Sequence, residues 1–410
     1  MRSRLFIFIS IVQTIIFAGH LFLYFTWSSF FGPAATSLSI KLMLAVLSMS
    51  FVAASMWGWY SHSLPARLFY LVAALWLGIA SYFLWASVLC WLAYGVSLAL
   101  HLGWAPLHIA EVLFGLAFAV SVYGVINAAR PRVVRMNIEL PNLPEQWRGR
   151  TAALVSDLHL GHIRNGRFIR RVVGKLKALR PDVVFLAGDK YDGVAADFDR
   201  LAEPWAEFLD AAAASKEEAQ AAEGMQAWRN GGDGGSTGSG ASSSQTAVLE
   251  AESFLGVYYI GGNHEEFYSD AEYLPPLLRA GVQVLNNEKV ELDGLQLVGV
   301  HYRDAVHPVR YREILQKLAI DRSRPSILLL HAPVQLPISE AHGISLQLSG
   351  HTHGGQFFPY TLIAKRVWGE FIYGLKRLGN MQVYTSYGAG TWGPPMRVGT
   401  TPEIVLINFQ

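Results

Sequence analysis

Cysteine and charge are scarce in this sequence. Cys90 is the only cysteine among 410 residues, so an intramolecular disulfide and a zinc site built from cysteines are both excluded. Charged residues make up only 16% of the chain, and the formal net charge is +2. A protein that binds nucleic acid gathers many lysines and arginines on one face to neutralise phosphates, so we expect no nucleic-acid partner.

Long apolar runs are what the sequence has in excess. Hydrophobic residues make up 52% of the chain, and the excess lies before residue 130. Four runs are long enough to cross a bilayer, which takes about 20 residues per helix. They are Leu5 to Trp27, Leu38 to Trp57, Leu68 to Gly95 and Pro106 to Ala128. These runs predict an all-α transmembrane bundle of about four helices over residues 1–130, with the lipid bilayer as its partner.

Basic residues flank these runs unevenly. Arg2 and Arg4 precede the first run, and Arg130, Arg132 and Arg135 follow the fourth. Loops on the cytoplasmic side of a membrane carry an excess of lysine and arginine. Four crossings therefore predict a multi-pass membrane protein whose remaining residues lie in the cytoplasm. A fifth crossing, which the long third run leaves open, would turn those residues outward.

From about residue 137 the composition changes to that of a soluble α/β domain, which we expect to extend to residue 410. Short β-branched runs alternate with helical patterns there. The runs predict strands at Ala152 to Ser156, Val183 to Ala187, Val257 to Gly261, Leu295 to Val300, Ile327 to Leu330, Ile344 to Ser349, Gln382 to Ser386 and Ile404 to Phe409. Apolar residues at helical spacing between the first two runs predict a β-α-β unit.

A polar segment interrupts this domain at about residues 211–252. Its first part is rich in Ala, Glu and Gln, and the tract from Gly231 to Ser244 consists largely of Gly and Ser. Such a composition buries too little apolar surface to build a core, so we interpret the segment as a disordered surface insertion.

Metal-ligating side chains follow five of the predicted strands at the point where each strand ends. Asp157 and His159 follow the first strand, Asp189 the second, Asn263 and His264 the third, His331 the fifth, and His351 and His353 the sixth. Because the carboxyl ends of strands in an open α/β sheet meet in one crevice, we expect these groups to converge. Carboxylates, an amide and imidazoles together suit borderline divalent ions such as Mn, Fe, Co or Zn.

The same residues lie in motifs whose composition and order are similar to those of a known family. The motifs are Ser156-Asp157-Leu158-His159, Gly188-Asp189 followed by Asp192, Gly262-Asn263-His264-Glu265, His331-Ala332-Pro333, and Gly350-His351-Thr352-His353-Gly354-Gly355-Gln356. They resemble the calcineurin-like metallophosphoesterases over about residues 137–410. The tail from Gly388 to Gly399 is similar to the branch that includes transmembrane proteins with a metallophosphoesterase domain.

This resemblance implies a fold, a ligand set and a chemistry. The implied fold is α/β, a metallophosphoesterase-type two-sheet sandwich flanked by helices in four layers (αββα). The implied ligands are Asp157, His159, Asp189 and His353 for one ion, and Asn263, His331 and His351 for the other, with Asp189 bridging the two. A hydroxide between the ions would attack phosphorus, and the catalytic His264 would stabilise the transition state or protonate the leaving oxygen.

Four further positions near the motifs are less specific. Asp192 is expected to orient a liganding imidazole. Lys190 is expected to face solvent or to contact the substrate phosphate, and His162 is interpreted as a surface group on a loop. His301 ends the fourth predicted strand and could line the crevice without binding metal.

The expected function is metal-dependent hydrolysis of a phosphate ester, with a diester preferred, by a membrane-anchored enzyme. Anchoring favours a lipid-linked or surface-confined substrate because it raises the effective concentration near such molecules. Two alternatives stay open. One is a pyrophosphate hydrolase acting on a nucleotide-linked acylated sugar, and the other is a membrane scaffold or sensor whose metal site binds without turnover.

Overall fold

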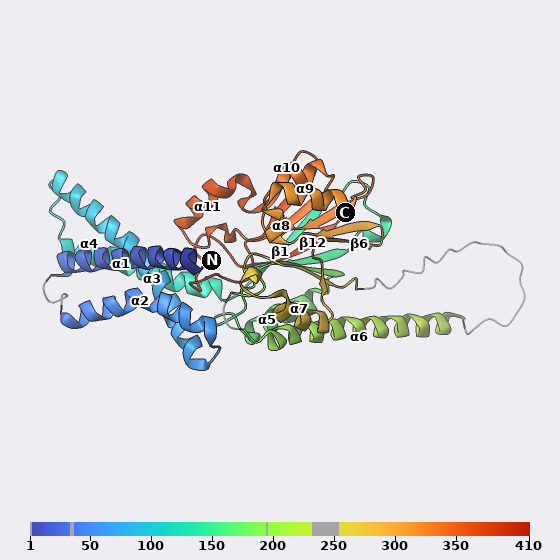
Figure 1. The fold of residues 1–410 in the computed structure, drawn as a ribbon, viewed down its shortest axis with the longest axis horizontal. Coiled ribbons are helices and arrows are strands. Elements are labelled where there is room, and N and C mark those ends of the chain that lie inside the picture. The colour runs from blue at the N-terminus through green and yellow to red at the C-terminus, as the bar shows by residue number, and fades with distance from the viewer. Residues whose placement is uncertain (1, 33–36, 194–195, 232–253) are drawn as a thin grey trace, which may run out of the picture.

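The chain forms an elongated helical bundle followed by an α/β sandwich (Figure 1). The computed structural model describes residues 2–32, 37–193, 196–231 and 254–410. The bundle lies at one end of the molecule, and the two sheets with their covering helices lie at the other.

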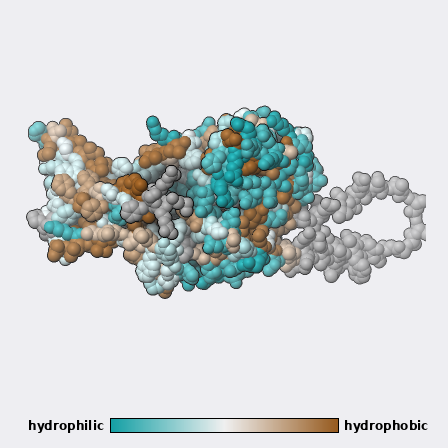
Figure 2. Space-filling model, viewed as in Figure 1, coloured by the Kyte–Doolittle hydropathy of each residue, from teal (hydrophilic) through white to brown (hydrophobic). Residues whose placement is uncertain are grey.

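Four apolar helices make up the bundle, each long enough to span a membrane. They are α1 (Arg2–Phe31), α2 (Leu38–Tyr60), α3 (Leu64–Ala99) and α4 (Pro106–Ala128). The third run forms one continuous helix of 36 residues, so the fifth crossing that the sequence left open is absent from these described segments. Small residues such as Ala54, Ala74 and Ala110 are buried where the helices touch, as in membrane bundles. Large apolar side chains cover the outside of this end (Figure 2).

The first sheet has six strands. In spatial order they are β1 (Arg132–Ile138), β12 (Glu403–Phe409), β2 (Thr151–Val155), β3 (Val183–Ala187), β4 (Val257–Ile260) and β5 (Gln283–Val284). Strands β2 to β5 pair in parallel, whereas β12 pairs parallel to β1 and antiparallel to β2. Every residue of β3 and β4 is buried, and this is why these strands read as unbroken apolar runs.

The second sheet also has six strands. In spatial order they are β10 (Gly374–Leu378), β11 (Met381–Thr385), β9 (Leu346–Ser349), β8 (Ser326–Leu329), β7 (Leu295–Gly299) and β6 (Glu288–Leu292). Its four central strands pair in parallel, and an antiparallel hairpin strand closes each edge.

Helices cover the outer face of each sheet. The first sheet is covered by α5 (Gly166–Leu179), α6 (Phe198–Gly231) and α7 (Asp270–Arg279), and the second by α8 (Tyr302–Ala305), α9 (Pro308–Leu318) and α10 (Leu336–Ala341). A buried core lies between the sheets, with Phe185 and Ile260 facing Leu297 and Leu348. Two further cores lie beneath the helices. The four-layer αββα sandwich predicted from the sequence is therefore confirmed.

The predicted insertion differs from the structure in its first half. Helix α6 continues to Gly231, through part of the segment interpreted as disordered, and residues 232–253 lie outside the described residues. Alanine, glutamate, glutamine and lysine are strong helix formers, so a segment too polar to build a core can still be helical. A last helix, α11 (Tyr360–Trp368), lies between the sandwich and the bundle.

Candidate metal centre

The seven predicted ligands lie together at one rim of the sandwich. Each follows a strand on the same edge: Asp157 and His159 after β2, Asp189 after β3, Asn263 after β4, His331 after β8, and His351 and His353 after β9. Because these strands run in parallel within their sheets, their carboxyl ends open into one crevice between the two sheets.

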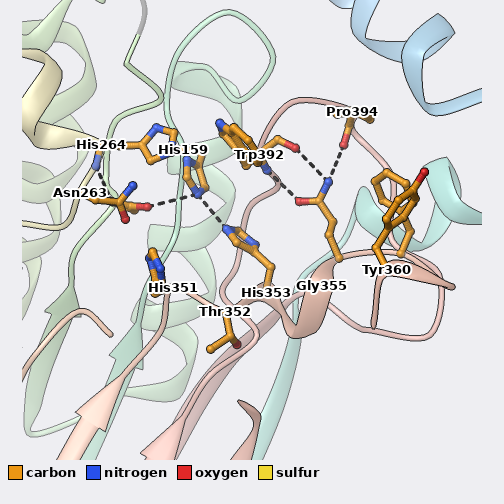
Figure 3. Close-up of a pocket in the computed structure, with 13 residues that line it drawn as sticks. His159, Asn263, His264, His351, Thr352, His353, Gly355, Tyr360, Trp392 and Pro394 are labelled. Carbon is orange, nitrogen blue, oxygen red and sulfur yellow. Dashed lines mark hydrogen bonds and ion pairs between the residues drawn. The ribbon is translucent and has the colours of Figure 1, made fainter. Parts of the chain in front are cut away.

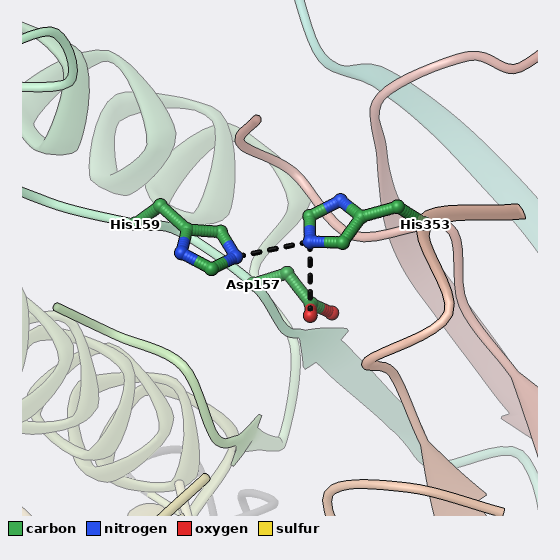
Figure 4. A group of neighbouring side chains, drawn as sticks. All are labelled: Asp157, His159 and His353. Atoms are coloured by element: carbon green, nitrogen blue, oxygen red, sulfur yellow. Dashed lines mark hydrogen bonds and ion pairs between the residues drawn. The ribbon is translucent and has the colours of Figure 1, made fainter. Parts of the chain in front are cut away.

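One group of ligand atoms is formed by Asp157, His159 and His353, whose side chains point toward one another (Figure 4). The Nε2 atoms of His159 and His353 are 2.9 Å apart, and Asp157 Oδ1 lies 3.5 Å from His353 Nε2. All three side chains are buried. Such close convergence of nitrogen and oxygen lone pairs fits a divalent cation.

A second group adjoins the first through Asp189. Asp189 Oδ2 lies 3.2 Å from His331 Nε2 and 3.7 Å from His159 Nε2, so it faces both groups. His331 Nε2 is also 3.1 Å from His351 Nδ1 and 3.2 Å from Asn263 Oδ1. The donor set therefore fits two neighbouring ions that share one carboxylate.

His264 lies beside both groups. Its ring meets that of His159 edge-on at a centroid distance of 4.6 Å, and its backbone N–H donates to Asp189 Oδ1 at 2.9 Å. Its Nδ1 atom is buried without a hydrogen-bond partner among the described residues. One ring nitrogen of His264 also lies within 4.8 Å of a ligand atom of His159 and of Asp189. The geometry therefore fits a metal-binding role for His264 as well as a catalytic role.

The backbone at the site adopts an uncommon conformation. Five of the seven predicted ligands have a left-handed φ: Asp157 at 52°, His159 at 47°, Asp189 at 49°, His351 at 71° and His353 at 47°. Such residues cost about 1–3 kcal/mol each and gather at functional sites. Glycines allow the close approach: a Cβ on Gly262 would lie 2.2 Å from Asp189 Oδ1, and one on Gly350 would lie 2.2 Å from Asp157 Oδ2.

The electrostatics of the site favour the metal-binding form of Asp189, His351 and His353, but not of every predicted ligand. Burial raises the pKa of Asp157, and the pKa of His159 is also raised, because the neighbouring carboxylates outweigh its burial. Burial acts to raise the pKa of Asp189, yet the neighbouring His331 and His264 hold it well below its ordinary value. Burial lowers the pKa of His351 to about 3, and burial with Arg397 beside it lowers the pKa of His353 well below its ordinary value. Neutral imidazoles keep the lone pair that a metal ion needs. Burial also acts to lower the pKa of His331, but Asp189 raises it to about 9, so an ion would have to displace that proton.

Glu265 has a positioning role that the sequence did not reveal. Its buried carboxylate accepts hydrogen bonds from the backbone N–H groups of Asp189 at 3.0 Å, Tyr191 at 3.0 Å and Gly262 at 2.7 Å. It thus joins the loops after β3 and β4. The motif Gly262-Asn263-His264-Glu265 contained this signal, but only the structure shows where the carboxylate points.

Arg397 is a second residue of this kind. It is fully buried; its guanidinium lies 2.9 Å from His353 Nδ1 and donates to the carbonyls of Tyr387 and Gly390 at 2.6 and 2.7 Å. Arg397 therefore fixes the ring of His353 from behind. In the sequence this arginine is indistinguishable from an exposed one.

Two of the less specific expectations are wrong. Lys190 faces neither solvent nor crevice, because it is buried and its ammonium donates to Tyr191 Oη at 2.7 Å. Burial lowers the pKa of Lys190 to about 7. His162 is not a surface group, since it is buried with Nε2 2.9 Å from the carbonyl of Gly58 in α2. Chain position alone could not show that its loop packs against the bundle.

The other two positions lie at the edge of the site. Asp192 Oδ1 is 3.5 Å from His159 Nδ1, on the side of the ring away from His353, where it can orient that ring. His301 is buried and accepts a hydrogen bond from the N–H of Arg303, outside both ligand groups.

A cavity of about 540 Å³ opens beside the ligands. Figure 3 shows His159, His264, His351 and His353 gathered at one side of it, with Pro394 and Tyr360 at the other. Phe357 packs on Tyr360 at the side away from the predicted ligands, whereas Trp392 lies between the two sides, 6.0 Å from the ring of His264. The cavity therefore joins a polar, metal-binding end to an aromatic and apolar end.

Fold and site together define a metal-binding α/β protein of the phosphoesterase class. Residues 151–355 match the calcineurin-like phosphoesterase family. The chain belongs to this calcineurin-like metallophosphoesterase family, whose members are metal-dependent phosphoric ester hydrolases that normally use a dinuclear centre.

Two relatives match most of the chain. An uncharacterized metallophosphoesterase of Campylobacter jejuni is 28% identical over 295 residues, which make up 70% of this chain and 66% of that protein. A transmembrane protein with metallophosphoesterase domain from Danio rerio is 29% identical over 306 residues, 71% of this chain and 60% of that protein. The chain thus spans less than two thirds of the length of these relatives. With its four apolar helices, it is a membrane protein.

Among solved structures, a dimetal phosphatase from Danio rerio shares 13% identity over 59% of this chain and 88% of its own, with a TM-score of 0.33.

Proposed function

We propose that this protein is a membrane-anchored phosphodiesterase that works with two divalent ions, drawn from Mn, Fe, Zn and Co. Asp157, His159, Asp189 and His353 would hold one ion. Asn263, His331 and His351 would hold the other, with Asp189 between them. The observation that carries the proposal is the position of Asp189 Oδ2, which faces His331 at 3.2 Å and His159 at 3.7 Å.

The residues around the ligands suit hydrolysis at phosphorus. Two bound ions would supply a hydroxide at neutral pH and neutralise the phosphoryl oxygens. His264 would stabilise the charge that develops on the leaving oxygen or protonate it. Trp392, 6.0 Å from the ring of His264, would limit the access of bulk water.

The catalytic domain of this multi-pass protein would lie on the cytoplasmic side. Arginines gather at the end of the bundle that meets the domain, and Arg130 and Arg132 follow α4 directly. This arrangement agrees with the excess of positive residues on cytoplasmic sides.

The aromatic end of the cavity also fits the second candidate, a pyrophosphate hydrolase on a nucleotide-linked acylated sugar. Such a substrate would place its acyl chain beside Phe357 and Tyr360 and its pyrophosphate at the ligands. Release of a nucleoside monophosphate from a nucleotide-linked sugar would favour this candidate over the diesterase.

Hydrolysis of bis-p-nitrophenyl phosphate and of p-nitrophenyl phosphate by the purified chain tests the proposal. We expect turnover of the diester with added Mn, loss of turnover with chelator, and loss in Asp189→Asn. Asp293→Asn is the matched control, because Asp293 lies in the β6–β7 turn, at the far end of the sheet from the ligands. Two bound metals without turnover of either ester would instead support a binding module.

A further inference from the structure

Helix α11 has an apolar surface that the sandwich leaves uncovered. None of its nine residues is buried. Leu362, Ile363 and Val367 are 60%, 62% and 68% exposed, and Lys365 and Arg366 accompany them. An exposed row of this kind on a short amphipathic helix is typical of a segment that lies in a membrane interface.

The position of α11 agrees with that interpretation. The hydroxyl of Tyr360, its first residue, lies 2.8 Å from Ser81 Oγ in the middle of the apolar helix α3. Ile363 and Val367 follow at spacings of three and seven, so they share a helix face with Tyr360. In Figure 1, α11 lies beside the domain end of the bundle, and Figure 2 shows a hydrophobic patch there. The apolar exterior of the bundle thus continues onto α11.

The cavity of the metal centre reaches this same region. Phe357 and Tyr360 line the cavity, and the ring of Phe357 meets that of Tyr82 in α3 at 6.0 Å. Met396 packs on Gly78 of the same helix so closely that a Cβ there would lie 2.2 Å from its sulfur. Helix α3 therefore backs the apolar end of the cavity, while the ligands occupy the opposite end.

The geometry points to a lipid phosphodiester as the substrate, taken from the bilayer between α3 and α11. This inference rests on the proposed function and names its substrate class. The headgroup phosphate would reach the metal ligands, and the acyl chains would stay against Phe357, Tyr360 and the apolar row of α11. Lys365 and Arg366 would attract the anionic headgroup region, where each basic residue contributes about 1 kcal/mol.

The cavity volume is consistent with partial uptake of the lipid. At about 540 Å³ it falls among small-molecule sites, which span about 300–1,000 Å³. A headgroup fits such a volume while the chains remain in the membrane. In the reaction, water adds to phosphorus, one phosphorus–oxygen ester bond breaks, and the leaving oxygen takes up the proton.

Two substrates with the same leaving group separate lipid recognition from chemistry. Ethyl p-nitrophenyl phosphate and hexadecyl p-nitrophenyl phosphate both release p-nitrophenol, but only the second inserts in a bilayer. The full chain is measured in phosphatidylcholine nanodiscs with Mn present. We expect the double variant Ile363→Glu and Val367→Glu to lower kcat/KM for the hexadecyl ester by about tenfold or more, because it removes two apolar anchors. Turnover of the ethyl ester should stay unchanged, which also reports correct folding.

The matched control is Val309→Glu on α9, because Val309 is 66% exposed but lies on the outer face of the second sheet. It should affect neither ester. Equal losses on both esters in the double variant, or no loss on the hexadecyl ester, would overturn the inference and leave the proposed function standing. Turnover of neither ester by the metal-loaded parent chain would refute both.

Discussion

His264 is enclosed by aromatic rings beside the ligands. The rings of Phe267 and Trp392 lie 5.6 and 6.0 Å from its ring. This enclosure fixes the direction in which the imidazole points. A group placed in this way can act on the oxygen that leaves phosphorus without having to bind metal.

Replacing His264 by alanine separates the two roles that the geometry permits. In the catalytic role, we expect both metals to be retained while turnover falls by about 10² to 10⁴, the usual contribution of positioned proton transfer. Metal content by mass spectrometry and turnover of the diester are measured on the same sample. His342→Ala is the control, since His342 ends α10 at the opposite end of the sheet. Loss of one metal in His264→Ala would make His264 a ligand.

For single residues, the sequence predicted the chemistry of the side chains but not the geometry of the backbone. The types and order of the seven predicted ligands pointed to a crevice at the strand ends, where the structure places these residues. The left-handed φ values of Asp157 and His353 could not be predicted, because neither residue type requires them. Glu265 and Arg397 were missed since a buried, hydrogen-bonded charge looks like a surface charge in a sequence.

Strand β12 links the two sheets through one buried carboxylate. Glu403 accepts hydrogen bonds from Tyr373 Oη at 3.0 Å, Tyr384 Oη at 3.2 Å and Ser386 Oγ at 2.9 Å. Tyr384 belongs to β11 of the second sheet, whereas Glu403 begins β12 of the first. The contact joins the layers at the rim that carries the ligands.

We expect Glu403→Ala to lower the free energy of unfolding of the α/β domain by about 2–4 kcal/mol, because several buried donors lose their acceptor. Chemical denaturation followed by tryptophan fluorescence measures the change. Glu139→Ala, at an exposed position just after β1, should change stability by less than about 0.5 kcal/mol. Equal stability of the two variants would contradict a linking role for Glu403.

Burial also decides which elements the sequence could predict. All eight expected strands are present, because strands covered on both faces read as apolar runs. Strands β1, β6 and β10 were missed since each is an edge strand with exposed polar residues, and β5 has only two residues. The sequence did not indicate that α6 continues to Gly231, because the low hydrophobicity of this segment is also typical of disordered chains.

The bundle and the sandwich are joined by the segment that carries Arg397. Asn127 in α4 donates to the carbonyls of Arg397 at 3.0 Å and Thr400 at 2.9 Å, and the N–H of Arg397 donates to the carbonyl of Gly124 at 2.9 Å. The side chain of Arg397 also contacts His353. Helix α4 and the candidate ligand His353 therefore contact the same residue, α4 through the backbone of Arg397 and His353 through its side chain.

A glycine makes this approach possible. A Cβ on Gly124 would lie 2.8 Å from the side chain of Val398, so we expect Gly124→Ala to destabilise the contact by about 1–3 kcal/mol through overpacking. Hydrogen exchange of residues 394–400 should become faster. Gly115→Ala on the same helix is the control, because nothing lies within 4 Å of its Cβ and alanine favours a helix by about 0.5–1 kcal/mol. Unchanged exchange in Gly124→Ala would show that the contact is loose.

The place of β12 between β1 and β2 sets the order in which the protein can be made. Glu403–Phe409 leaves the ribosome after every other strand of both sheets, so the first sheet stays open until then. Until then β1 lacks β12, the one strand that it pairs with among the described residues. Unpaired apolar strand edges are prone to wrong pairing, and such distant pairs form slowly. A chain with a late or missing β12 would therefore hold β1 and β2 without the strand that joins them, so closure of the first sheet depends on the strand that is synthesised last.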